Sequence, residues 1–134
     1  MRKFILMSLL AGVSSNAMAD GTPVEIGSGF GDGRVFAYPS TIKKAGSDVT
    51  MWDQLNASTP QDLPGHSPYL SKTSLVQYAC EDLRTRTLYQ NFWSQKDATG
   101  ARILQTDTAT LLDWKPVQPG TAQEALFKFA CGKK

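Results

Sequence analysis

The chain has 134 residues, a length typical of a single domain, and it carries 14 Lys and Arg against 12 Asp and Glu. Arg2 and Lys3 lie in a segment that we expect to be removed on export, and subtracting these two from 14 leaves 12 basic and 12 acidic residues in the mature chain. Because the mature chain is neutral overall, its charge does not favour nucleic acid, and we expect no nucleic-acid partner.

Residues 1–19 have the three parts of a signal peptide. A basic start is followed by an apolar run at 4–11 and by small residues at positions 17 and 19, which predicts cleavage after Ala19. A membrane anchor is the alternative, but the apolar run is far shorter than the roughly 20 residues that a membrane-spanning helix needs. No cysteine follows the cleavage site, so we expect no lipid anchor and a mature protein that is periplasmic or secreted.

Residues 20–33 are rich in glycine and are predicted to form a flexible lead to a single domain at 34–134. Within this lead, glycine occupies every second position from Gly27 to Gly33. A P-loop would also need a lysine and a strand–loop–helix setting, which this stretch lacks, so no phosphate site is predicted there.

The domain is predicted to fold as an antiparallel meander, because runs of β-branched and aromatic residues alternate with turn signals. Alternation in the second expected strand places Val49 and Met51 on one face. In the third it places Val76, Tyr78 and Cys80 on the face that we expect to meet a helix. Expected strands cover residues 34–38, 49–53, 74–80, 85–93 and 101–105, with a hairpin turn at 96–100.

The fourth expected strand, at 85–93, carries aromatic residues on both of its faces, which favours a central position in the sheet. Strict alternation divides its residues into two sets. One set is Arg86, Leu88, Gln90 and Phe92, and the other is Thr85, Thr87, Tyr89, Asn91 and Trp93.

Residues 55–71 interrupt the strand pattern with three prolines and no period. We predict a long irregular loop, of a kind that is often functional when it occurs in a compact domain. It contains His66, the only histidine in the chain.

The end of the chain predicts one amphipathic helix. Thr121 and Glu124 have the spacing of a capping box, in which the Glu carboxylate accepts the backbone N–H of the Thr. A turn-forming Pro119–Gly120 pair precedes them. The apolar positions of the helix share one face and end near the second cysteine: Ala122, Ala125, Leu126, Phe129 and then Cys131.

Cys80 and Cys131 are the only cysteines, and in an exported chain this favours a disulfide between them. Closing such a loop is worth about 4 kcal/mol by the chain-entropy estimate. Two free thiols, or a bridge between two chains, are the alternative. The chain has no C-x-x-C motif, so a redox catalyst is not predicted.

Several of these stretches together resemble the surface-adhesin protein E-like domains of Gram-negative bacteria. The resemblance covers residues 34–131, and its most specific part is the segment Trp114–Cys131, with the spacing W-x-P-x-x-P-G-T and a terminal cysteine. Further landmarks are Tyr38, Val49–Trp52, Tyr78–Cys80, Thr85–Tyr89 and Lys96–Gly100.

The resemblance implies an α+β fold, an antiparallel sheet of about six strands with one C-terminal helix packed on it and the two cysteines bridged. Some members of the family are outer-membrane lipoproteins that bind host extracellular-matrix and plasma proteins and can form homodimers. The chain lacks the lipidation cysteine of those members. The resemblance therefore implies an adhesin-like protein-binding domain. A periplasmic accessory or structural protein with a bacterial partner and no host role is the alternative.

No catalytic, metal or cofactor site is predicted. His66 has no second histidine to complete a metal site, and nothing in the sequence places a nucleophile and an orienting acid beside it. Pairs of carboxylates for acid–base chemistry fall at expected strand ends and turns, where acids are normally solvated. These acids are Glu81, Asp82, Asp107 and Asp113.

A binding surface is the more credible kind of site. Basic and aromatic side chains gather around the expected fourth strand and the hairpin after it, a mixture that suits an acidic protein or polysaccharide. The alternative is an ordinary sheet surface whose arginines oppose edge-to-edge association. The candidate binding residues are Arg84, Arg86, Tyr89, Lys96 and Arg102.

The three tryptophans, Trp52, Trp93 and Trp114, have two readings. They form an aromatic binding platform, or they pack in the core, which is the more common use of tryptophan.

Overall fold

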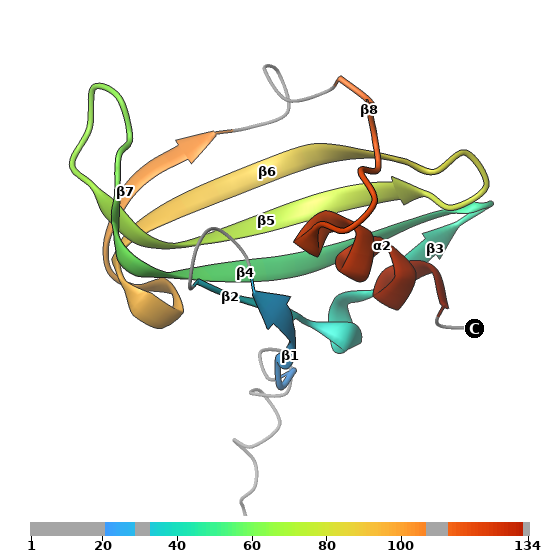
Figure 1. Cartoon of the computed structure of the whole chain (residues 1–134), viewed down its shortest axis with the longest axis horizontal. Coiled ribbons are helices and arrows are strands. Elements are labelled where there is room, and N and C mark those ends of the chain that lie inside the picture. The colour runs from blue at the N-terminus through green and yellow to red at the C-terminus, as the bar shows by residue number, and fades with distance from the viewer. Residues whose placement is uncertain (1–20, 29–32, 107–112, 133–134) are drawn as a thin grey trace, which may run out of the picture.

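The computed structural model describes residues 21–28, 33–106 and 113–132. The predicted signal peptide at 1–19, its cleavage site and the carboxylate of Asp107 lie outside the described residues. Within the described ranges, one antiparallel sheet is covered on one face by a single α-helix (Figure 1).

The sheet contains eight strands in the described part of the chain, and six of them follow one another in the order β1-β2-β4-β5-β6-β7. β3 and β8 are short additions that pair with β4 and β6. The antiparallel meander with a C-terminal helix confirms the predicted α+β class. The elements are β1 (Val24–Ser28), β2 (Arg34–Ala37), η2 (Pro39–Thr41), β3 (Lys43–Ala45), β4 (Asp48–Gln61), β5 (Tyr69–Ala79), β6 (Arg84–Gln95), η3 (Lys96–Ala98), β7 (Thr99–Thr106), β8 (Lys115–Pro116) and α2 (Ala122–Gly132).

β1 corrects the prediction of a flexible lead at 20–33. Val24 pairs with Ala37 and Ser28 with Arg34, so this stretch is an edge strand on β2. The register shifts between Glu25 and Gly27, and this irregularity hides the period of two that would have indicated a strand. The stretch also has few β-branched residues, so its order comes from the partner strand that the fold supplies.

The predicted loop at 55–71 is wrong for most of its length. β4 continues to Gln61 and β5 begins at Tyr69, which leaves only residues 62–68 between them. The pairing passes from Asn56–Ser71 to Gln61–Tyr69 through a register shift, and the proline at position 60 lies within it. Prolines are tolerated in a sheet at such irregularities. For this reason β4 extends beyond the point at which the sequence pattern predicted its end.

A bulge in β6 corrects the two residue sets predicted for this strand. Leu75 of β5 pairs with Tyr89, whereas the next residue, Val76, pairs with Thr87, so Leu88 is an extra residue in β6. Every residue after Leu88 therefore faces the side opposite to that which strict alternation predicts. As a result, Tyr89 lies on the same face as Arg86 rather than on the opposite one.

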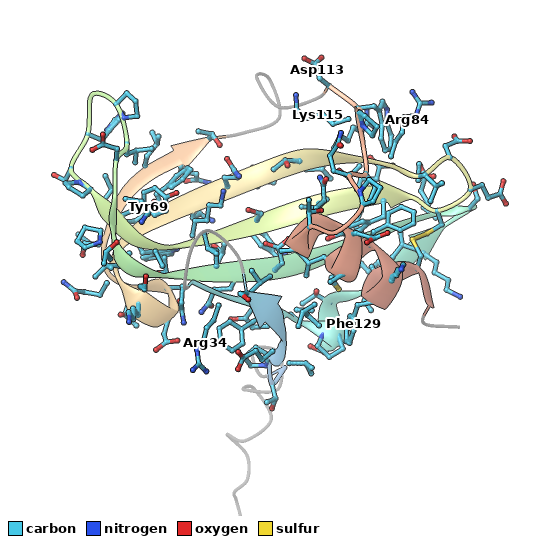
Figure 2. The ribbon with its side chains drawn as sticks, in the orientation of Figure 1. Arg34, Tyr69, Arg84, Asp113, Lys115 and Phe129 are labelled. Carbon is cyan, nitrogen blue, oxygen red and sulfur yellow. A yellow bond between two sulfur atoms is a disulfide. The ribbon has the colours of Figure 1, made fainter. Side chains whose placement is uncertain are left out.

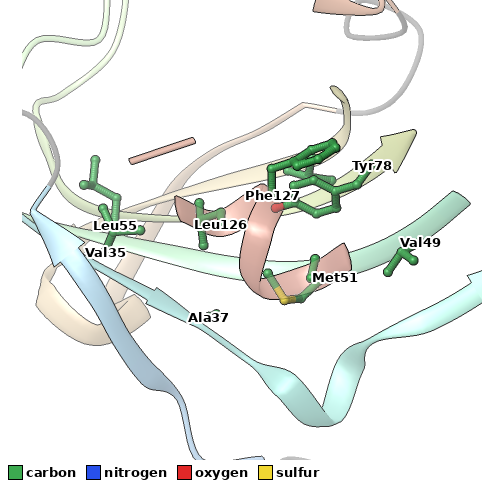
Figure 3. Packing of buried hydrophobic residues seen from close by; sticks show 10 residues of the cluster. Val35, Ala37, Val49, Met51, Leu55, Tyr78, Leu126 and Phe127 are labelled. Carbon is green, nitrogen blue, oxygen red and sulfur yellow. The ribbon is translucent and has the colours of Figure 1, made fainter. Parts of the chain in front are cut away.

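The hydrophobic core lies between α2 and the face of the sheet that carries Met51 and Tyr78, as the alternation predicted (Figure 3). From the helix, Leu126, Phe127 and Ala130 are the buried residues. The ring of Phe127 meets the ring of Tyr78 edge-on, with 6.0 Å between centroids. The buried stripe thus includes Phe127, which the predicted helical face did not, whereas Phe129 is only partly buried at its edge.

The disulfide between Cys80 and Cys131 is present, with an S–S distance of 2.07 Å. Cys80 directly follows β5, and Cys131 lies in the last turn of α2. The bond therefore ties the C-terminal end of the helix to the end of β5, a strand in the middle of the sheet order.

The start of α2 is capped largely as predicted. The Thr121 hydroxyl accepts the backbone N–H of Glu124 at 3.2 Å. The Glu124 carboxylate accepts the backbone N–H of Gly120 at 2.9 Å, one residue before the amide that a capping box would use. Thr121 also donates its hydroxyl proton to the carbonyl of Gln118 at 2.7 Å, so one hydroxyl fixes both sides of the helix start.

We expect Thr121→Ala to lower the free energy of unfolding by about 1 kcal/mol, because it removes the cap of the only long helix among the described residues. Urea unfolding of the oxidised mature chain measures this change. Ser67→Ala, which removes a hydroxyl from the exposed 62–68 loop, is the matched control and should leave the midpoint unchanged. A Thr121 variant as stable as this control would contradict the capping role.

Candidate functional site

The two faces of the sheet carry different kinds of side chain. α2 covers the face that includes Met51 and Tyr78. We name the opposite side the open face. It carries a row of neighbouring residues on three adjacent strands, in which Trp52 pairs with Leu75 and Leu75 pairs with Tyr89. Trp52 and Leu75 are half-buried and Tyr89 is 38% exposed, so the row forms an apolar strip on the surface of the sheet.

The structure brings three of the five predicted binding residues together. Arg84 and Arg86 are two positions apart on β6 and face the same side, and the bulge places Tyr89 on that side as well. Lys96 lies in η3, at the other end of the strand, after roughly 40 Å of extended chain. Arg102 is on β7 opposite Trp93, so it belongs with that distant end.

Arg86 is held by contacts on two sides. Its guanidinium carbon lies 4.5 Å from the centroid of the Trp114 ring, a stacking arrangement that favours a cation over an aromatic face. Its Nε donates to the side-chain oxygen of Gln77 at 2.8 Å, and Gln77 donates in turn to Asp48 at 2.8 Å. A long side chain that is already ordered loses less entropy when a partner binds.

The end of the sheet near Arg84 carries a further cation that sequence reasoning did not single out. Lys115 of β8 pairs with Thr85, which faces α2, so the register places the Lys115 side chain on the helix-covered side at the edge of the sheet. Figure 2 shows Arg84, Asp113 and Lys115 together at this end. Arg84 keeps about half of its side chain exposed, and its nearest acid, Asp82, is 4.0 Å away. We name Arg84, Arg86, Tyr89, Trp52 and Trp114 the open-face cluster.

The tryptophans lie outside the buried core among the described residues. Trp52 and Trp114 belong to the open-face cluster, and Trp93 donates its indole N–H to Thr73 at 3.5 Å on the same face. Core packing is therefore wrong for these tryptophans, and an aromatic binding platform stays a prediction.

The helix-covered face contains a second feature, a partly enclosed pocket of about 580 Å³ beside the start of α2. Its walls come from strands β1, β2, β4, β5 and β6 and from the segment that leads into the helix. Asp53 and Lys72 lie in it, on adjacent strands and on the same face, as diagonal neighbours. We name this cavity the helix-start pocket.

Burial changes the ionisation of both charged groups in the helix-start pocket. It raises the pKa of the Asp53 carboxyl from 3.8 to about 7, although the positive charge of Lys72 opposes this shift. It lowers the pKa of the Lys72 ammonium, and the carboxylate of Asp53 opposes that change. Lys72 also lies 5.9 Å from the centroid of the Phe92 ring. Each charge favours the ionised form of the other, but burial has the larger effect on both groups.

The sequence held a signal for this pocket that the predicted strand boundaries obscured. The alternation that places Val49 and Met51 inward reaches Asp53 at its next step. The alternation that places Tyr78 and Val76 inward reaches Lys72 two steps earlier in the chain. Two charged residues at inward positions of neighbouring strands are unusual, and they indicate a buried pair.

His66, by contrast, does not gain partners for chemistry from the fold. It lies in the 62–68 loop, in a shallow depression beside Ala101 and Ile103 of β7. Across the residues that the structure describes, no three His, Cys, Asp or Glu side chains gather as a metal site would require. Among these described residues, no helix has the length and hydropathy needed to cross a membrane.

This geometry defines a class of small disulfide-linked domains, in which a C-terminal helix covers one face of an antiparallel meander. The chain belongs to the surface-adhesin protein E family, whose model matches residues 24–132. The match begins at the first residue of β1, so this strand is part of the family domain. Membership indicates an exported or surface protein that is adhesin-like, with a non-enzymatic role.

Among solved structures, crystal form II of Haemophilus influenzae protein E is similar over 73% of this chain and 80% of that chain, with a TM-score of 0.57. The two sequences are 10% identical, and at this level the likeness shows the fold alone. No curated protein matches the chain.

Proposed function

We propose that the chain is an exported binding domain without enzymatic activity that recognises another protein through the open-face cluster. The observation that carries this proposal is the presence of Arg84, Arg86 and Tyr89 on one face of β6, the face that α2 does not cover. Tyr, Trp and Arg are the residues that most often dominate the energetics of protein interfaces. The family, which is one of adhesins, supports a protein as the partner.

The charge of the cluster favours an acidic region of the partner. Arg84 and Arg86 supply positive charge on the open face, and the strip of Trp52, Leu75 and Tyr89 supplies apolar contact. Cations around an apolar strip suit a protein surface that has carboxylates around an exposed apolar patch. Components of the host extracellular matrix are the partners that we propose to test first.

We expect the triple variant Arg84→Gln, Arg86→Gln, Tyr89→Ser to bind a reconstituted basement-membrane matrix at least about tenfold more weakly than the unaltered chain, since it removes two charges and one aromatic contact. Surface plasmon resonance with the mature chain measures the affinity. The control is the double variant Lys44→Gln, Lys128→Gln, which removes two exposed charges from the side of the sheet that α2 covers, since Lys44 pairs with the inward-facing Val49 and Lys128 lies on α2. Equal loss in both variants would mean that net charge alone drives binding, and no loss in the triple variant would mean that the surface is wrong.

A periplasmic accessory protein with a bacterial partner is the second candidate function. The same cluster would then bind an envelope protein rather than a host component. Protease treatment of intact cells, followed by fractionation, separates the two candidates. A protein that resists external protease and stays with the periplasmic fraction would overturn the adhesin role and leave the accessory role. Sedimentation of the purified mature chain over a range of concentrations tests the proposed homodimer.

A further inference from the structure

The helix-start pocket has a size and a lining that suit a small molecule. Its volume of about 580 Å³ falls within the usual range for ligand sites, roughly 300–1,000 Å³. Val35, Leu55, Val76 and Leu126 give it apolar walls. The pocket lies on the opposite side of the sheet from the open-face cluster, so a ligand in the pocket and a protein on the open face would occupy different surfaces.

Positive charge and hydrogen-bond donors converge on this pocket. Lys72 lies in its wall, and the segment from Gly120 to Gln123 brings the N-terminal end of α2 to its rim. The first backbone amides of a helix, here those of Ala122 and Gln123, have no acceptor within the helix. The helix dipole adds partial positive charge at this end, and it favours an anion there.

An independent observation points to a missing acceptor. The Tyr78 side chain lines the same pocket and is 1% exposed, yet its hydroxyl has no hydrogen-bond partner among the described residues. Buried hydroxyls in folded proteins are almost always paired, so an unpaired one requires an explanation. In Figure 3 the hydroxyl end of Tyr78 points toward the first turns of α2 rather than away from them.

We propose that the helix-start pocket binds a small monocarboxylate with an apolar body. The carboxylate accepts hydrogen bonds from Lys72, from the Tyr78 hydroxyl and from the first amides of α2. The apolar body lies against Leu55 and Leu126.

Asp53 makes this binding dependent on pH. An ionised Asp53 repels a bound carboxylate, whereas a protonated Asp53 does not, and burial places the pKa of this group at about 7. The titratable groups that face Asp53 are Lys72 and Tyr78, both from β5. From α2, the pocket is lined by Ala122, Gln123 and Leu126, none of which titrates. The ligand therefore binds more tightly as the pH falls through about 7.

The first experiment compares three probes of equal length, octanoate, octanamide and octylamine, by NMR titration of the mature chain at about pH 6. We expect octanoate to bind, octanamide to bind at least about tenfold more weakly, and octylamine to give no saturable shifts. The shifts should include the methyl groups of Val76 and Leu126 and the amides of Ala122 and Gln123. Equal affinity for octanoate and octanamide would overturn the anion site, and absence of saturable shifts at these residues with octanoate would overturn the pocket.

Variants separate binding from folding. Lys72→Met should weaken octanoate binding about tenfold, and Tyr78→Phe, which keeps the ring against Phe127, should weaken it about threefold. Lys44→Met removes the same charge from exposed β3 and should have no effect. Asp53→Asn should strengthen binding about fivefold at pH 8.5 and leave it unchanged at pH 5.5. A damaged fold cannot produce that gain, so unchanged or weaker binding by the Asp53 variant at pH 8.5 would contradict the proposal.

Discussion

Replacement of both Cys80 and Cys131 by alanine is expected to lower the free energy of unfolding by about 4 kcal/mol, because the bond closes a loop with a sequence separation of 51 residues. Small domains are stable by only about 5–15 kcal/mol, so this is a large fraction of the total. The loop contains β6, β7 and β8 and most of α2, so its closure restricts nearly half of the domain in the unfolded chain.

The position of the bond adds a second expectation. α2 is held on the sheet by Leu126, Phe127 and Ala130, three buried residues on an 11-residue helix. Without the bond to Cys80, the helix end is free to separate from β5 before the sheet unfolds. We therefore expect the contact between Phe127 and Tyr78 to be lost at a lower urea concentration than the sheet signal.

Urea unfolding followed by far-ultraviolet and near-ultraviolet circular dichroism measures both effects. Reduction of the unaltered chain should reproduce the midpoint of the double alanine variant, and reductant should not change the variant itself. This comparison separates loss of the bond from any effect of the alanine side chains. A double variant within about 1 kcal/mol of the oxidised chain would show that the unfolded ensemble is already compact.

The local patterns of the sequence predicted much of this fold. Alternation in β4 and β5 predicted that Val49, Met51, Val76 and Tyr78 face the core, because one face of an antiparallel strand must meet the core, and all four are buried. The capping residue Thr121 predicted the start of α2 to within one position. The disulfide was expected from export and from the count of two cysteines, and it is present.

The bulge at Leu88 could not be predicted in the same way. Nothing in the residues from Thr85 to Trp93 marks an extra position, since a bulge depends on how β6 matches the twist of β5. Its consequence for the site is large, because it brings Tyr89 to the same face as Arg84 and Arg86. The structure therefore places these three predicted residues on one face and Lys96 and Arg102 at the other end of β6, and a binding role for any of the five stays a prediction.

The helix-start pocket illustrates a different limit. Asp53 and Lys72 were in reach of sequence reasoning, but the second strand was predicted to end at Asp53 and the third to begin after Lys72. A strand is usually predicted to end at a charged residue, because charged residues are rarely buried. That assumption fails where two opposite charges on adjacent strands are buried together.

We expect Asp53→Asn to raise the free energy of unfolding at pH 8 by about 2–4 kcal/mol and to change it little at pH 4. The pKa of Asp53 is raised from 3.8 to about 7 in the folded chain, mainly by burial. Between these two values the folded state holds a proton that the unfolded state has lost. Stability from this group is therefore complete below about pH 4, falls as the pH rises, and is lost above about pH 7.

The asparagine side chain has nearly the same shape as aspartate and does not ionise. The free energy of unfolding of the variant should therefore not fall in this way as the pH rises. Part of the gain is offset, because the buried Lys72 ammonium loses the carboxylate that favours its charged form. Urea unfolding at several pH values from 4 to 8 measures the difference between the two curves. Asp62→Asn, in the exposed loop between β4 and β5, is the control and should give a curve parallel to that of the unaltered chain.

Parallel curves for Asp53→Asn would show that this carboxyl is solvated and titrates as in a free peptide. If the free energies of unfolding of the variant and the unaltered chain instead diverge as the pH rises, the chain keeps a buried acid at a cost in stability near neutral pH. Such a cost has no structural benefit that the core requires, because Val49 and Met51 on the same strand already pack against α2. The same substitution is expected to strengthen octanoate binding at high pH. A gain in both stability and affinity would place Asp53 in a site whose occupancy is controlled by protonation.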